Sequence, residues 1–243
     1  MLFEAALLAI AALAGALAAI TGFGIGSLLT PLLALRMDTR LAVALVSVPH
    51  VVGTALRFLL LSGAVDRKVL VSFGVTSAVG GLAGALLQSV ASNRWLTMLF
   101  GALLLFAAAS EATGLAGRMR FRGRVAWIAG ALSGLLGGLV GNQGGLRSAA
   151  LLGFGLDKRT FVATATAIGL LVDGARMPVY VATQYHELSA MWMPILLAVA
   201  GVVVGTVLGS RALSRLPDVW FHRVLALVLA ALGCSMVARA FLS

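Results

Sequence analysis

The chain has 243 residues, of which 61% are hydrophobic and only 11% are charged, and its mean hydropathy is +1.07. Soluble domains carry about a quarter charged residues, so this composition excludes a water-soluble globular protein. The formal charge of +10 does not indicate a nucleic-acid partner, because the basic residues lie in short segments between apolar runs, where they orient a membrane protein. We therefore expect an all-α, polytopic transmembrane helical bundle whose surroundings are the lipid bilayer.

Apolar runs of membrane length recur along the whole sequence, since one crossing needs about 20 helical residues. In chain order they cover 2–36, 41–62, 69–91, 95–114, 125–155, 159–183, 190–211 and 220–242. The first and fifth runs are interrupted by glycine clusters, GFGIG at 22–26 and GNQGG at 141–145. Glycine permits tight reversals of the backbone, so we predict a break at each cluster.

The two interrupted runs belong to an internal repeat. A shift of 119 residues, the separation of Gly22 and Gly141, also places Arg57 on Arg176. The same shift aligns further glycines and charges, namely Gly15 with Gly134, Gly26 with Gly145, Asp38 with Asp157 and Arg40 with Arg159. We predict a single membrane domain over 1–243, made of a first repeat at 1–116, a basic cytoplasmic loop at 117–124 and a second repeat at 125–243.

The distribution of basic residues in the loops distinguishes between two membrane topologies. If both interrupted runs cross the membrane fully, the basic residues divide almost evenly between its two sides. If each run enters and returns as a re-entrant hairpin, one side keeps only Arg36, Arg40, Arg94 and Arg239. The other side then holds Arg67, Lys68, Arg118, Arg120, Arg122, Arg124, Lys158, Arg159, Arg211, Arg215 and Arg223. This bias follows the positive-inside rule, so we predict two inverted repeats, each a hairpin plus three transmembrane helices, with both termini outside the cytoplasm.

The hairpin tips are predicted to bind an anion. A short helix follows each tip, beginning near Ser27 or Leu146, and its free amide groups and positive dipole end point back at the tip. We expect the substrate to contact the tip glycines and amides, which are Gly22, Gly24, Gly26, Gly141, Asn142, Gln143, Gly144 and Gly145. The alternative is that the glycines only allow close helix packing, which does not account for their clustering with two amides.

Three arginines lie inside apolar runs, where a charge is costly without partners: Arg57, Arg147 and Arg176. Because Arg57 and Arg176 are repeat mates, we expect both to face one central cavity and bind the substrate. The alternatives are that Arg57 extends to the membrane interface and that Arg176 only pairs with Asp173. Arg147 lies one turn into the second short helix, where it either balances the substrate's charge or reaches the interface.

Two titratable residues share helix faces with these arginines. His50 lies seven residues before Arg57, and Asp173 lies three residues before Arg176. A carboxylate and an imidazole at this depth are candidates for proton coupling. The alternatives are that Asp173 is a charge partner of Arg176 and that His50 is a hydrogen-bonded packing residue.

The segment GFGIGSLLTPLL at 22–33, the GNQGG cluster, the repeat of about 120 residues and the basic loop GRMRFRGR at 117–124 resemble the TauE/SafE family of sulfite and organosulfur-anion permeases. The resemblance implies a polytopic inner-membrane carrier of sulfite, sulfoacetate, thiosulfate or a related anion, often working in the export direction. Three positions depart from the family's pattern: Ile25 interrupts the first glycine triplet, Gln143 replaces a glycine of the second, and Ala150 stands where a second proline is usual. They bear on the substrate more than on the fold.

We therefore expect a secondary transporter that exports a small sulfur-containing oxyanion by alternating access around a midplane site. An anion channel and a carrier of a related anion are the alternatives, and a membrane scaffold is a third. An enzyme is not expected, because His50, His186, His222 and Cys234 are too scattered to form a metal site or a nucleophile–base pair. No cofactor or metal is expected. Small-residue stripes at 80–84 and 201–205 would pack helices within one protomer or between two, and we expect a homodimer.

Overall fold

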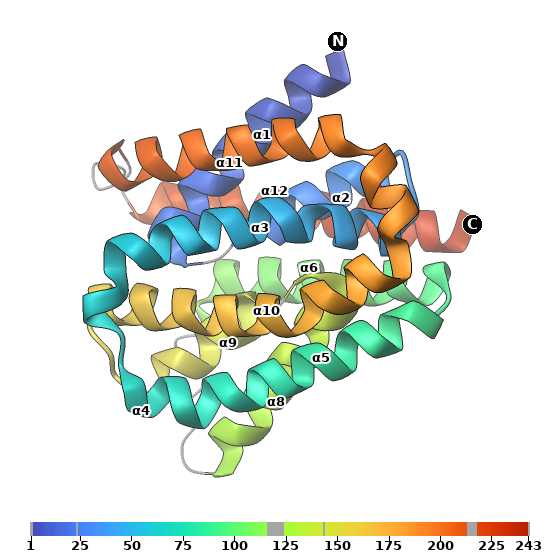
Figure 1. Ribbon diagram of the computed structural model, residues 1–243. Coiled ribbons are helices and arrows are strands. Elements are labelled where there is room, and N and C mark those ends of the chain that lie inside the picture. Colours follow the sequence, from blue (N-terminus) through green and yellow to red (C-terminus); the bar gives the residue numbers. More distant parts are fainter. Residues whose placement is uncertain (1, 23, 116–123, 143, 213–217, 243) are drawn as a thin grey trace.

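The computed structural model describes residues 2–22, 24–115, 124–142, 144–212 and 218–242, and within these ranges the chain is helical without strands (Figure 1). The part predicted as the first repeat contains α1 (Leu2–Thr21), α2 (Ile25–Ala34), α3 (Thr39–Leu61), η1 (Ser62–Ala64), α4 (Arg67–Val69), η2 (Leu70–Gly74), α5 (Val75–Val90) and α6 (Asn93–Thr113). The second contains α8 (Arg124–Val140), α9 (Gly144–Leu152), α10 (Lys158–Ala190), α11 (Trp192–Ala212) and α12 (Asp218–Leu242). The expected all-α class is confirmed.

Helices of membrane length account for most of the described chain. Six are long and apolar enough to cross a bilayer, at Phe3–Thr21, Thr39–Ala64, Arg67–Val90, Asn93–Thr113, Lys158–Ala190 and Trp192–Gly209. Their outer faces are apolar, as along η2 and α5, where Val71, Val75, Val79, Leu82 and Leu86 are exposed. Such a surface is stable only against lipid, so the chain is a multi-pass membrane protein.

The predicted breaks lie where the glycine clusters are. The chain turns between α1 and α2 with positive φ angles of 78° at Gly22 and 131° at Gly24, and between α8 and α9 with 71° at Gly141. These values are in the region that side-chain-bearing residues rarely adopt, which explains why glycine occupies the turns. Both short helices begin two residues earlier than the sequence predicts, at Ile25 and Gly144.

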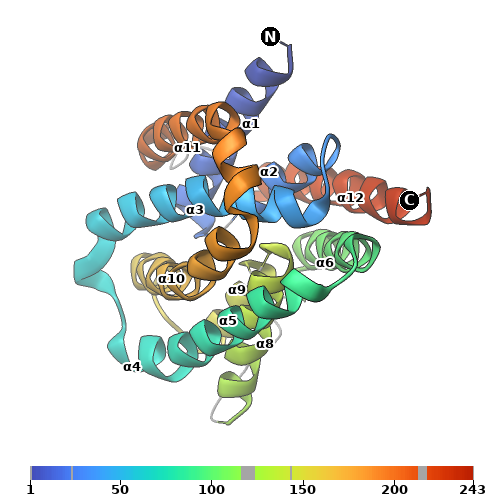
Figure 2. The same ribbon diagram turned by 45° about the vertical axis from the view of Figure 1, so that its right-hand side comes forward.

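The described helices pack closely in pairs. Figure 2 shows α1 beside α11 on one side and α5 beside α8 on another, with α3 and α10 between them. The remaining pair is α6 with α12. Under the shift of 119 residues, α1 corresponds to α8 and α11 to α5, so these two lateral pairs join equivalent helices of the two halves.

Glycines bring the lateral pairs into backbone contact. A Cβ atom on Gly80 would overlap the Ala131 carbonyl oxygen of α8, and one on Gly205 would overlap the Ala12 carbonyl oxygen of α1. Both small-residue stripes therefore pack helices within the chain. They are not available as an interface for a homodimer, which stays a prediction.

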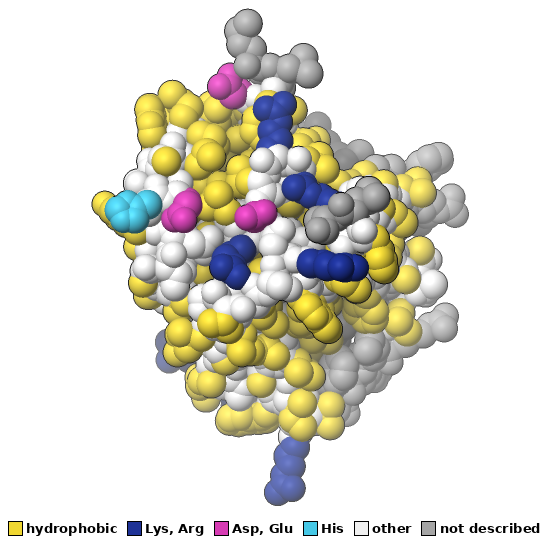
Figure 3. All heavy atoms as spheres, turned by 90° about the vertical axis from the view of Figure 1, so that its right-hand side faces the viewer, with side chains coloured by type: hydrophobic (Ala, Val, Ile, Leu, Met, Phe, Trp, Pro, Cys, Tyr) yellow, Lys and Arg dark blue, Asp and Glu magenta, His cyan; other side chains and the backbone are white. Residues whose placement is uncertain are grey.

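One end of the bundle gathers both termini. The guanidinium of Arg36, just after α2, lies 4.1 Å from the ring centroid of Phe3 at the start of α1. Arg239, near the end of α12, donates from Nη2 to the Met37 carbonyl oxygen at 3.4 Å. Seen from this end, charged side chains lie toward the middle of the face and hydrophobic ones mostly around its rim (Figure 3). The beginning of α1, the loop after α2 and the end of α12 thus lie together.

The long helix α10 starts at a polar cap and ends beyond the predicted span. Asp157 Oδ1 accepts hydrogen bonds from the backbone N–H groups of Arg159 and Thr160, at 3.0 and 3.2 Å. Hydrogen bonds from the Thr160 side chain and backbone lower the pKa of the Asp157 carboxyl. The helix continues to Ala190 rather than ending at 183, with one non-helical residue, Gln184, inside it.

Candidate functional site

The two glycine tips meet in the middle of the bundle. A Cβ atom on Gly26 would overlap the Gly141 carbonyl oxygen, so the tips touch backbone to backbone. Ser27 Oγ donates to Asn142 Oδ1 at 3.2 Å across the same junction. No side chain caps the start of α2, whose cap residue is Gly24. The first amide groups of α2 therefore have no partner within their own helix, as at any helix N-terminus.

Two polar faces cross beside this junction, one from α3 and one from α10. His50 Nδ1 on α3 lies 2.7 Å from Asp173 Oδ2 on α10, so the imidazole donates to the carboxylate. Arg176 binds the other carboxylate oxygen, with Nε at 3.0 Å and Nη2 at 2.8 Å. Its Nη1 donates to the carbonyl oxygen of Gly137 at 2.7 Å. Every nitrogen of the Arg176 guanidinium is therefore engaged.

Arg147 links the tips to the crossing helices. Its side chain is 2% exposed, and Nη2 donates to the Gly22 carbonyl oxygen in the other tip at 3.2 Å. Arg147 Nη1 and the Thr54 methyl lie 3.2 and 3.3 Å from where a Cβ atom of Gly169 would be. Gly169 thus leaves the room that the guanidinium occupies.

Arg57 approaches the same place from α3. It is 3% exposed, and Nη2 donates to Thr54 Oγ1 at 3.1 Å. Thr54 borders Gly169, as Arg147 does, so the two guanidinium groups lie near each other. Their charges repel each other, and Asp173 attracts both. Arg57 therefore does not extend to the membrane interface, which was one reading of the sequence.

Unmatched donors distinguish these two arginines from Arg176. Nε and Nη1 of Arg57 and Nε and Nη1 of Arg147 are buried without a hydrogen-bond partner. Among the described residues, Asp173 is the one buried carboxylate beside three buried arginines, so two positive charges are unbalanced when His50 is neutral. A buried, unpaired guanidinium is costly. The geometry therefore favours an anion at Arg57 and Arg147.

Most predicted site residues converge here. His50, Arg57, Arg147, Asp173 and Arg176 surround the tip junction, and Asn142 belongs to it. The tip glycines are Gly22, Gly24, Gly26, Gly141 and Gly144, and Gly145 lies in the first turn of α9. Gln143 is outside the described residues.

Sequence reasoning missed four buried polar residues, of which Gln88 lies farther from the site than the other three. Ser27 Oγ donates to Asn142 in the second tip, and Tyr180 Oη donates to the Gly138 carbonyl oxygen of α8, just before that tip. Thr30 is fully buried with an unpartnered hydroxyl. Gln88 is also fully buried. Each lies within a predicted apolar run, the same signal that identified the arginines.

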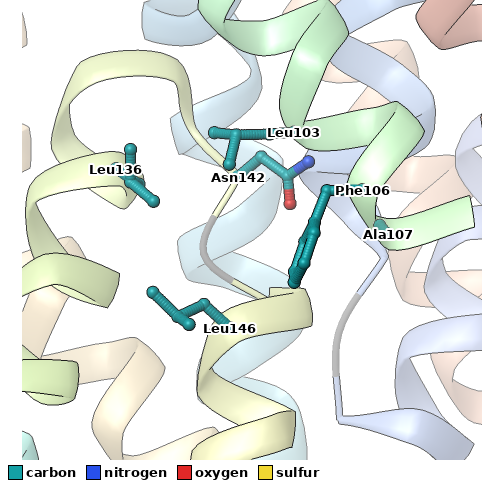
Figure 4. A pocket seen from close by; sticks show the side chains of 6 residues that line it. All are labelled: Leu103, Phe106, Ala107, Leu136, Asn142 and Leu146. Atoms are coloured by element: carbon teal, nitrogen blue, oxygen red, sulfur yellow. The ribbon is translucent and has the colours of Figure 1, made fainter. Parts of the chain in front are cut away.

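A cavity of about 240 Å³ lies between α6 and the α8–α9 segment, and Asn142 is part of its lining. Figure 4 shows the Asn142 amide beside Phe106 and Leu103 of α6, with Leu136 and Leu146 from the hairpin. Its lining is apolar apart from Asn142. An anion would find one amide and no charge here, so we do not assign the site to this cavity.

Comparison with known protein families identifies the family of this chain. The model of a family described as sulfite exporter TauE/SafE matches residues 7–236 of the 243. The chain belongs to the TauE/SafE family. None of the curated proteins and none of the solved structures compared with the chain matches it.

Members of the TauE/SafE family are membrane transporters and not enzymes, so this chain is a multi-pass transporter of sulfur-containing anions. The resemblance seen in the glycine clusters is confirmed over nearly the whole chain. A transporter of this class needs a buried place for a negative charge. The unmatched donors of Arg57 and Arg147 lie where the two tips meet.

Proposed function

We propose that this TauE/SafE protein is a secondary transporter that exports a small sulfur-containing oxyanion such as sulfite and binds it at Arg57 and Arg147. The observation that carries the proposal is that Arg57 and Arg147 each have two buried guanidinium nitrogens without partners. A doubly charged oxyanion would balance the two excess positive charges and accept hydrogen bonds from these nitrogens. Charge-assisted bonds of this kind are strong in a low-dielectric interior.

The tips supply the remaining contacts in this proposal. The free amide groups of α2, the Asn142 amide and Gln143 would also donate to the oxyanion. The tip glycines let the backbone approach the anion closely. Arg176 acts as a positioning residue, because its donors already hold Asp173 and the Gly137 carbonyl oxygen.

In this proposal, alternating access uses two inverted halves of the chain. We propose that the chain consists of inverted repeats in the inner membrane, each with a re-entrant hairpin, and that both termini lie outside the cytoplasm. The contact of Arg36 with Phe3 supports entry and return of the first hairpin at one end of the bundle. Leu151, near the end of α9, shares a hydrophobic cluster with Val69 and Phe73 at the start of the Arg67–Val90 span, which supports return of the second hairpin at the opposite end.

This topology has a direct test. A reporter that is active only outside the cytoplasm, fused after Ser243, is expected to be active, and one inserted in the loop at 117–124 is expected to be inactive. The pair controls for expression, since each fusion is the other's reference. The reverse pattern would contradict the proposed orientation.

The movement requires the tips to separate. Ser27–Asn142 and Arg147–Gly22 are hydrogen bonds between the tips, and rocking one repeat against the other would break them. In the present conformation Arg57 and Arg147 are buried, which supports a closed state of a carrier. A cytoplasm that is electrically negative favours anion exit by about 2.3 kcal/mol per charge for each 100 mV, so export needs no ATP.

Counter-transport of radiolabelled sulfite in proteoliposomes tests the function. We expect uptake to saturate with sulfite concentration and to be accelerated by unlabelled sulfite inside, because a carrier reorients faster when loaded on both sides. Thiosulfate, sulfoacetate and chloride added as competitors rank the substrates. Flux that neither saturates nor responds to internal sulfite would indicate a channel, and absence of flux for every sulfur anion would contradict the proposal.

A further inference from the structure

The polar face of α10 continues beyond the site. Asp173, Arg176, Tyr180 and Gln184 follow one another at intervals of three or four residues and so share one side of the helix. All four are buried, with at most 6% exposure. The row leads from Arg176 toward the end of the bundle where both termini lie, because α10 ends at Ala190 on that side (Figure 1). A buried polar row of this length is unusual in a membrane helix and marks substrate paths.

A second helix contributes to the far end of this row. Gln88 of α5 is fully buried, and its Oε1 accepts a hydrogen bond from Gln184 Nε2 at 3.5 Å. Gln88 Nε2 has no hydrogen-bond partner. Gln184 also interrupts the helical backbone of α10, with φ −136° and ψ 28°. If the two amides served only to join α5 to α10, we would expect a shorter bond and no unmatched N–H group.

Tyr180 separates this amide pair from the arginines. It is fully buried, packs in one cluster with Ala44 and Ala85, and donates from Oη to the Gly138 carbonyl oxygen of the second hairpin. Because the bond ends on the hairpin, movement of that hairpin would release the tyrosine. Gln184 thus lies one helical turn beyond Tyr180, and the hairpin that holds Tyr180 is an element that moves in the proposed transport cycle.

We propose that Gln88 and Gln184 form a second binding station for the transported anion, between the arginine site and the end of the bundle that carries the termini. The inference rests on the proposed function. Two amides offer N–H donors without a net positive charge, so they bind an oxyanion more weakly than Arg57 and Arg147 do. Weak binding suits a station that an anion must leave.

The test uses Gln88→Met, Gln184→Met and the double variant, which keep side-chain length but remove the amides. Sulfite uptake is measured in right-side-out and inside-out membrane vesicles, together with equilibrium sulfite binding to the purified proteins. We expect the half-saturation concentration to rise at least fivefold when sulfite is supplied at the face that carries the termini. It is expected to stay unchanged at the other face, as is binding to the purified protein.

The matched control is Ser77→Ala, which removes a fully buried polar group from the same helix α5. It is expected to keep wild-type half-saturation at both faces. Equal changes at both faces, or wild-type values in the double variant, would overturn the second station. If the double variant does not fold, the single variants carry the same comparison. Absence of sulfite uptake by the wild-type protein would instead contradict the proposed function and is read from the same vesicles.

Discussion

Arg57→Ala and Arg147→Ala are each expected to weaken sulfite binding by about 10- to 100-fold, because a hydrogen bond to a charged group contributes about 1.5–3 kcal/mol. Counter-transport at fixed, subsaturating sulfite is expected to fall by a similar factor. Arg57→Lys and Arg147→Lys keep the charge but lose the forked geometry, so we expect partial loss. Isothermal titration of the purified protein with sulfite and flux in proteoliposomes measure the two quantities.

Stability without sulfite distinguishes this explanation from a folding defect. The arginines repel each other and leave donors unmatched, so removing one of them is not expected to lower the unfolding temperature of the anion-free protein. The rise in unfolding temperature that sulfite causes in the wild type is expected to disappear. Arg94→Ala, at an exposed arginine, is the matched control and is expected to bind sulfite normally. Normal binding by Arg57→Ala and Arg147→Ala would exclude these residues from the site.

Asp173→Ala is expected to have the largest effect on stability. The carboxylate receives bonds from His50 and Arg176 and is fully buried, and removing one member of a buried ion pair costs about 3–5 kcal/mol. The variant also adds one unbalanced positive charge to the centre. Chemical unfolding in detergent, followed by tryptophan fluorescence, measures the change in unfolding free energy.

Asp157→Ala provides the control for this variant. Asp157 is an exposed carboxylate at the start of the same helix α10, so its removal affects a cap and no ion pair. We expect it to reduce stability much less than Asp173→Ala does. The double variant Asp173→Leu with Arg176→Met removes both charges and is expected to recover much of the lost stability without recovering transport. Equal stability of Asp173→Ala and the wild type would contradict the role given to this pair.

The sequence predicts the helices well because the signals are local. Apolar runs delimit the spans, and the glycines that need positive φ mark both breaks. The end of α10 was missed by seven residues, since TQYHELSA at 183–190 is not apolar. A helix needs apolar side chains only where lipid surrounds it, so a polar segment can continue it beyond the span.

The partners within the site could not be predicted in the same way. Sequence spacing places Asp173 one turn before Arg176, and the structure confirms that pairing. The repeat suggested Arg57 and Arg176 as equivalent ligands, but Arg176 is engaged by Asp173 and Arg147 takes the place beside Arg57. The position of Arg147 depends on its hydrogen bond to the Gly22 carbonyl oxygen, and these two residues are 125 positions apart in the sequence. No local pattern encodes it.

The position of a bound anion decides whether Arg57 and Arg147 form the binding site. Selenite has the shape and charge of sulfite and carries an atom with a strong anomalous signal. In crystals of the protein grown with selenite, we predict an anomalous peak within hydrogen-bond distance of both the Arg57 and Arg147 guanidinium groups, and its loss in Arg57→Ala. A peak at another site, or an empty arginine pair under conditions where selenite competes with sulfite for transport, would contradict it.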